Sequence, residues 1–189
     1  MNGRNKMLNK SRSVLKLILI MILISFSGNL YSAPMYDAWG ISKESVIKQF
    51  VKSNETIDEF TLNKKPDYDN KIMNMVKLIM KNIDSDVEKE IIIINTKSVP
   101  RRDFLLFKNK LFSIMELYES LSKDDLSGVV KKLTAQYGEP NYNPGEGMEI
   151  YFISNKTTKI IVHYYIKTKK CEIYYYDAAL YRKLSTNEY

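Results

Sequence analysis

The stretch 159–167 reads Lys-Ile-Ile-Val-His-Tyr-Tyr-Ile-Lys and indicates most clearly how this chain folds. It is rich in β-branched and aromatic residues, which favour strands. Successive side chains of a strand point to opposite faces, so Ile160 and Val162 are expected on one face, packed against helices. Ile161 and His163 are expected on the other face, which would be partly solvated. The stretch therefore predicts one strand of a sheet with two different faces.

Further strands are predicted on both sides of this one. Short polar turns separate it from Glu149–Ser154 and Cys171–Asp177, and the three together predict an antiparallel meander. Earlier in the chain, short apolar runs predict strands at Ile91–Ile94, Phe104–Phe107 and Leu111–Met115. The loop expected at 140–147 is rich in Gly and Pro.

The helix from 122 to 137 has the strongest start and stop signals. Ser122 and Asp125 form a capping box, and apolar residues follow at helical spacing. Gly138 then provides a left-handed stop, and Pro140 prevents the helix from continuing. Two weaker helices are predicted, one capped by Ser42 and one between about 70 and 83.

These elements predict an α+β fold in which helices pack on one face of an antiparallel β-sheet. A capped helix followed by a hairpin occurs twice, so the domain is expected to consist of two helix-plus-hairpin halves, at about 39–116 and 119–184.

Three segments resemble small exported bacterial envelope domains of unknown function: Trp39–Val46, Phe107–Leu111 and Leu133–Pro140. Their characterised relatives are similar in architecture to the outer-membrane assembly accessory lipoproteins and the β-lactamase inhibitory proteins. The resemblance implies helices packed on an antiparallel sheet, and it assigns no functional residue. The chain departs from the accessory lipoproteins because no cysteine follows its N-terminal apolar run, so no lipid can be attached there.

The N-terminal region has the order of an export signal. Basic residues precede an apolar run at 14–26, and small polar residues follow. The run is shorter than the roughly 20 residues that a membrane-spanning helix needs. Residues 1–32 are therefore predicted to be a signal peptide, which leaves 33–189 as a single α+β domain that is periplasmic or secreted. The alternative is an uncleaved anchor, in which residues 14–28 tether the domain to the inner membrane.

The charge of the chain depends strongly on this segment. The net charge is +7, but the residues before Asp37 carry five of the 29 basic residues and no acidic one. The remainder has 24 basic and 22 acidic residues, a net charge of +2. With the export signal, this near-neutral balance argues against nucleic acid as a partner. A membrane is expected as a partner only through an uncleaved N-terminal segment.

Candidates for catalysis are few. His163 is the only histidine, so a histidine triad or a zinc site would need it, but its mid-strand position favours a half-buried sheet residue. Cys171, the only cysteine, follows Lys169 and Lys170, which could lower the pKa of its thiol; an inert, buried cysteine is the alternative. The sequence therefore predicts no catalytic residue, no cofactor and no metal site.

Tyrosine is in clear excess, with 14 in the chain. Tyrosine is enriched in protein interfaces because its ring is rigid and amphipathic. The sequence assigns a binding face to Tyr165, Tyr174 and Tyr176, and predicts that Tyr174 and Tyr176, or Tyr165, are largely exposed.

These observations favour an exported, non-catalytic binding or inhibitor-like module of the bacterial envelope, acting through a Tyr-rich sheet face. Its partner is expected to be another protein or a peptide in the envelope. The alternative function is a small envelope hydrolase that uses His163 or a carboxylate pair.

Overall fold

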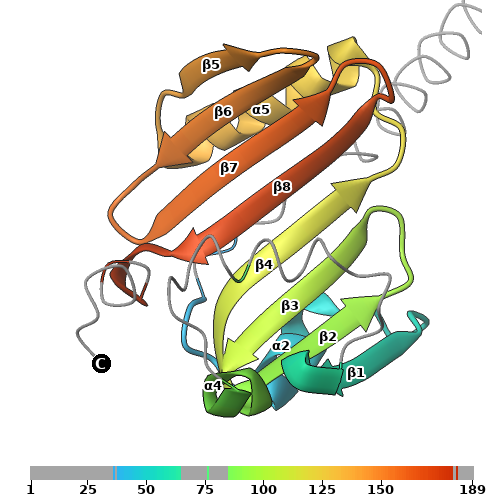
Figure 1. Ribbon diagram of the computed structural model, residues 1–189, viewed down its shortest axis with the longest axis vertical. Coiled ribbons are helices and arrows are strands. Elements are labelled where there is room, and N and C mark those ends of the chain that lie inside the picture. Colours follow the sequence, from blue (N-terminus) through green and yellow to red (C-terminus); the bar gives the residue numbers. More distant parts are fainter. Residues whose placement is uncertain (1–35, 37, 65–75, 77–84, 181, 183–189) are drawn as a thin grey trace, which may run out of the picture. The chain divides into compact units, whose positions relative to one another are not determined.

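Figure 1 shows the computed structural model, which describes residues 36, 38–64, 76, 85–180 and 182. Contacts within the chain divide it into residues 1–34 and residues 35–189, and all described residues belong to the second unit. The predicted signal peptide, the alternative anchor at 14–28 and most of the helix predicted between 70 and 83 lie outside the described residues. None of the described helices has the length and apolar character needed to cross a membrane.

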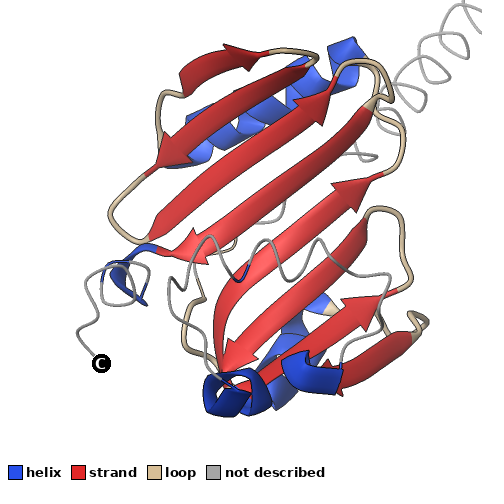
Figure 2. Ribbon diagram, in the orientation of Figure 1, coloured by secondary structure: helices blue, strands red, loops and turns tan. Residues whose placement is uncertain are grey.

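Eight strands form one open antiparallel sheet in the order β1-β2-β3-β4-β8-β7-β6-β5 (Figure 1). The strands are β1 (Ile57–Thr61), β2 (Ile91–Thr96), β3 (Arg101–Phe107), β4 (Lys110–Tyr118), β5 (Asn141–Gly145), β6 (Met148–Ser154), β7 (Thr158–Tyr165) and β8 (Lys170–Asp177). The described helices are α2 (Lys43–Phe50), the 3-10 helix η1 (Leu62–Lys64), α4 (Ser85–Glu90) and α5 (Lys123–Tyr137) (Figure 2). The α+β class with an antiparallel sheet is therefore confirmed.

The ends of α5 are those predicted from the sequence. The Ser122 hydroxyl accepts a hydrogen bond from the backbone N–H of Asp125 at 3.1 Å, which satisfies one free donor of the first turn. Gly138 ends the helix with φ of +110°, a conformation that favours glycine. The Ser42 prediction was wrong in one respect, because its side chain makes no capping hydrogen bond to α2.

The strand β5 lies in a segment that was expected to be a loop. Pro144 and Gly145 weakened the strand signal there, since neither residue favours a strand. The strand forms because β5 is at the sheet edge and pairs only with β6. A proline is tolerated at an edge, where a missing backbone N–H need not interrupt the hydrogen bonding of the sheet.

One face of the sheet is covered by α2 and α5, which lie behind it in Figure 1. Phe50 of α2 stacks on Phe104 of β3 with ring centroids 5.8 Å apart. Lys123 at the start of α5 forms an ion pair with Glu149 of β6. We call this side of the sheet the helix face.

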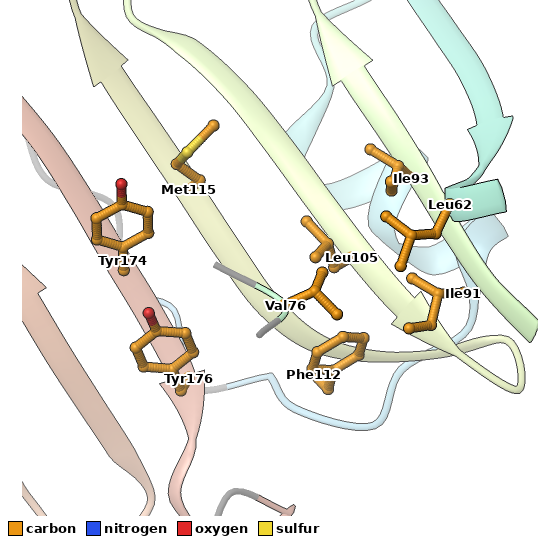
Figure 3. Packing of buried hydrophobic residues seen from close by; sticks show 9 residues of the cluster. All are labelled: Leu62, Val76, Ile91, Ile93, Leu105, Phe112, Met115, Tyr174 and Tyr176. Carbon is orange, nitrogen blue, oxygen red and sulfur yellow. The ribbon is translucent and has the colours of Figure 1, made fainter. Parts of the chain in front are cut away.

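The opposite face carries a separate apolar cluster (Figure 3). Its buried members come from η1, from the helical residue Val76 and from four strands: Leu62, Val76, Ile91, Ile93, Leu105, Phe112, Met115, Tyr174 and Tyr176. Val87 of α4 also packs against this cluster. The expectation that the helices pack on one face is therefore not confirmed, because η1 and α4 contribute to the face opposite α2 and α5.

A bulge in β4 adds Phe112 to this cluster. Leu105 pairs with Ser113, whereas the next residue, Leu106, pairs with Leu111, so Phe112 is the extra residue. An extra residue shifts the alternation of side chains by one position. Phe112 is thereby turned into the cluster, where it is 1% exposed.

Candidate functional site

Two neighbouring strands, β6 and β7, continue the face that carries the cluster. Ile150 of β6 pairs with His163 of β7, and Phe152 pairs with Ile161, so the side chains of these pairs lie on the same side. Tyr165 lies on this side two positions beyond His163. We call these five residues the β6–β7 face.

The β6–β7 face is apolar and only partly covered. Phe152 is 42% exposed, and the other four residues are half-buried. The described helices with the most residues, α2 and α5, lie on the helix face of the sheet (Figure 1). The described part of the chain therefore leaves aromatic and aliphatic side chains of β6 and β7 accessible to solvent.

The three tyrosines assigned to a binding face lie on this side of the sheet, but two of them are not at the surface. Tyr174 and Tyr176 are 4% and 1% exposed and belong to the buried cluster (Figure 3). Tyr165 is half-buried. The prediction that Tyr174 and Tyr176, or Tyr165, are largely exposed was therefore wrong, because the first two are buried and Tyr165 is half-buried.

The position of β8 explains their burial. This strand pairs with β4 on one side and with β7 on the other, so it is an inner strand of the sheet. The rings of Tyr174 and Tyr176 are parallel, 6.4 Å apart, and Met115 and Val76 belong to the same cluster. Burial of such rings stabilises the fold by roughly 1.5–3 kcal/mol each.

Glu172 joins two of these tyrosines through hydrogen bonds. The Tyr174 hydroxyl donates to Glu172 Oε2 at 2.5 Å, and the Tyr165 hydroxyl donates to the same oxygen at 3.3 Å. Burial, together with the adjacent carboxylate, raises the pKa of both phenols. Both hydroxyls are therefore protonated donors at neutral pH, and Glu172 fixes the orientation of Tyr165 within the β6–β7 face.

His163 is opposite Glu172 in the β7–β8 register, and its ring meets the Tyr174 ring edge-on with centroids 5.4 Å apart. Burial lowers the pKa of His163, and the negative charge of Glu172 partly opposes this shift. The imidazole is therefore mainly neutral at pH 7.

A cavity of about 220 Å³ is present on this side of the sheet. It lies at the end of the β6–β7 hairpin, and its lining residues come from β6, β7 and β8: Phe152, Ile153, Ser154, Lys159, Ile160, Ile161 and Tyr176. Among the described residues, the lining includes neither His163 nor any carboxylate. No cluster of three potential metal ligands occurs among the described residues.

The structure gives Cys171 the properties of an inert thiol. Its side chain is fully buried, and burial, with smaller contributions from Glu116 and Glu172, raises the thiol pKa to about 12. The thiolate that a nucleophile or metal ligand requires is therefore scarce at neutral pH. Proximity of Lys169 and Lys170 in the sequence does not lower this pKa.

A buried carboxylate that the sequence did not predict, that of Glu116, lies on the helix face. Glu116 accepts hydrogen bonds from Tyr36 at 2.8 Å, Tyr175 at 3.2 Å and Tyr118 at 3.3 Å. Burial raises the pKa of Glu116, and the hydrogen bonds from Tyr36 and Tyr175 and the charge of Arg102 act against this shift. The only sequence signal was a charged residue directly after a predicted apolar strand.

Comparisons with protein-family models, with curated proteins and with solved structures found no match to this chain. The resemblance to exported envelope domains therefore stays a prediction from the sequence.

Proposed function

We propose that this protein is an exported, non-catalytic binding module of the bacterial envelope that holds a partner protein against its β6–β7 face. The export signal before residue 33 supports an envelope or secreted location. The proposed contact surface lies on the same side of the sheet as Tyr174 and Tyr176. The contact is made by residues of β6 and β7 and not by these two buried tyrosines.

One observation carries the proposal: an apolar strip whose centre, Phe152, is 42% exposed beside half-buried Ile150 and Ile161. Contiguous exposed apolar residues on a folded domain are typical of binding surfaces. Buried neighbours hold residues of this face in place. Ile161 packs against the buried cluster, and the Tyr165 hydroxyl donates a hydrogen bond to Glu172. A rigid aromatic surface loses little conformational entropy when it binds.

The alternative function is a small envelope hydrolase that uses His163 or a carboxylate pair. It has less support, because neither His163 nor a carboxylate is among the described residues that line the cavity beside the β6–β7 face. It stays a prediction from the sequence.

We also propose that the domain is built from two halves, α2 with β1–β4 and α5 with β5–β8. Each half begins with a helix on the helix face and contains four strands, and in the first half η1 and α4 lie between β1 and β2. The last strands of the two halves, β4 and β8, pair with each other in the sheet. This order supports the two-half arrangement expected from the sequence.

A capture experiment with matched variants tests the proposed function. The full chain with a C-terminal tag would be expressed in a bacterial host, cross-linked in the intact envelope and purified with any bound protein. The test variant is Phe152→Ser. The control is Tyr142→Ser, which removes an aromatic side chain of similar exposure, 48%, from the neighbouring strand β5 on the helix face.

We expect Phe152→Ser to reduce recovery of the partner at least tenfold, while Tyr142→Ser leaves it unchanged. Equal recovery with both variants, or loss with Tyr142→Ser alone, would show that the β6–β7 face is not the contact surface.

A further inference from the structure

The strand β5 is an edge of the open sheet, and its residues are accessible. It pairs with β6 on one side, and no described strand pairs with it on the other (Figure 1). All residues of β5 are exposed, and the aromatic side chain of Tyr142 is 48% exposed. An accessible edge strand is a template for pairing with a further strand, provided that its outward backbone groups can form hydrogen bonds.

The hydrogen bonding around β6 determines which backbone groups of β5 point outward. At one end of β6 the backbone N–H of Ile166 donates to the Gly147 carbonyl, and at the other end that of Asn155 donates to the Thr158 carbonyl. Backbone groups alternate in direction along a strand, so the odd-numbered residues of β6 direct theirs to β7. The even-numbered residues of β6 therefore form the hydrogen bonds with β5.

The outward positions of β5 are Tyr142 and Pro144. The other residues of β5 pair with even-numbered residues of β6, so their backbone groups point inward: Asn141, Asn143 and Gly145. Proline has no backbone N–H, and its ring takes the place of the missing hydrogen. Pro140, two positions before Tyr142, lacks the next N–H in the same alternation. The outward N–H that β5 retains is therefore that of Tyr142, between two prolines.

A second copy of the chain would meet this obstacle directly, because each copy has the same edge. Two β5 strands related by a two-fold axis would pair antiparallel, with Tyr142 opposite Tyr142 of the second copy. Pro144 of each copy would then face Pro140 of the other. The central pair could exchange its hydrogen bonds, whereas the proline pairs could form none and would leave their carbonyl groups without donors.

We propose that Pro140 and Pro144 close the β5 edge to strand addition, so that a second copy of this chain does not extend the sheet there. Prolines on edge strands are one of the features by which proteins avoid pairing between sheets. The inference goes beyond the proposed function and does not rest on it, because it concerns the sheet edge and not the β6–β7 face. It also gives a role to prolines that weaken the strand signal of this segment.

Two matched double variants of the purified full chain test this role. Pro140→Val with Pro144→Val restores the outward N–H groups. Asn141→Val with Asn143→Val is the control, because it raises strand propensity at positions whose N–H groups point to β6. Sedimentation velocity over a concentration series measures self-association. We expect the proline variant to self-associate at a concentration at least tenfold lower than the wild-type chain, and the control to match the wild-type chain.

Self-association of the proline variant that equals that of the wild-type chain, or an equal increase in both variants, would overturn the inference. If the double variant does not fold, Pro144→Val alone restores one outward donor and should still increase self-association, and no increase would count against the proposal.

Amide hydrogen exchange tests the edge without any substitution. In a dilute solution of the wild-type chain, the Tyr142 amide should exchange at least tenfold faster than the Asn143 amide, because only the second donates to β6. Equal protection of the two amides would show that the outward side of β5 is already paired, and would also overturn the inference.

Discussion

At the scale of single residues, the two faces of the sheet each contain a carboxylate surrounded by tyrosine hydroxyl groups. Glu116 on the helix face accepts three such hydrogen bonds, and Glu172 on the opposite face accepts two. A buried carboxylate without hydrogen bonds would destabilise the fold by several kcal/mol. Five of the 14 tyrosines therefore donate hydrogen bonds to these two carboxylates inside the domain.

The pKa of His163 provides a direct test of the Glu172 environment. Burial lowers this pKa from 6.5, and the charge of Glu172 raises it. Glu172→Gln removes the negative charge that raises the pKa of His163, so we expect this pKa to fall further below 6.5. Because His163 is the only histidine, its Cε1 proton gives a single titrating signal in a proton NMR spectrum recorded across a pH series.

Glu116→Gln is the matched control for this titration, because it makes the same change on the other face of the sheet. We expect it to leave the His163 midpoint unchanged. A midpoint that stays constant or rises in Glu172→Gln would contradict the assigned pairing of His163 with Glu172.

At the scale of elements, α2 and α5 both follow a serine, but only one of these serines is a functional cap. The Ser122 side chain accepts a backbone hydrogen bond from the first turn of α5, whereas the Ser42 side chain makes none with the backbone of α2. The Ser42 hydroxyl instead donates to the Ser45 hydroxyl at 3.4 Å. The same residue type at the same helix position therefore has different energetic roles.

We expect Ser122→Ala to lower the free energy of unfolding by about 1 kcal/mol, the usual cost of a lost N-cap. Ser42→Ala should lower it by less than half as much. Urea denaturation of both variants followed by circular dichroism measures the difference. Equal losses, or a larger loss for Ser42→Ala, would contradict the hydrogen bonding of the two caps.

At the scale of the whole domain, Tyr36 connects segments that are distant in the sequence. Its backbone N–H donates to the Tyr137 hydroxyl of α5 at 2.9 Å, and its carbonyl accepts from Thr158 of β7 at 3.3 Å. Its ring is 1% exposed and meets the Tyr175 ring edge-on, and its hydroxyl donates to Glu116. The folded domain therefore includes a residue only four positions after the predicted cleavage site.

A chain that begins at residue 38 lacks this connection, whereas a chain that begins at Ala33 keeps it. We expect the shorter chain to be less stable by roughly 3–5 kcal/mol, the usual cost of removing a buried aromatic side chain. Tyr36→Phe in the longer chain should cost about 1–3 kcal/mol, because it removes only one hydrogen bond to a buried carboxylate. Equal urea midpoints for the two chains would contradict a structural role for Tyr36.

The sequence by itself determined most of the local elements of this protein. The limits of α5 follow from Ser122 and Gly138, and the strands β2, β3, β4, β6, β7 and β8 follow from apolar runs, because caps and side-chain alternation depend on neighbouring residues. The edge strand β5 was missed because Pro144 weakens the local strand signal and only pairing with β6 overcomes it.

Only the tertiary structure decided which side chains reach the surface. The sequence placed Tyr174 and Tyr176 on one face but could not show that β8 lies between β4 and β7, where both rings are buried. It also gave no sign that three tyrosines converge on Glu116. Strand order and burial depend on contacts between residues far apart in the chain, which no local pattern records. For this reason the sequence predicted a binding surface at the tyrosines of β8, whereas the structure leaves Phe152 of β6 accessible in their place.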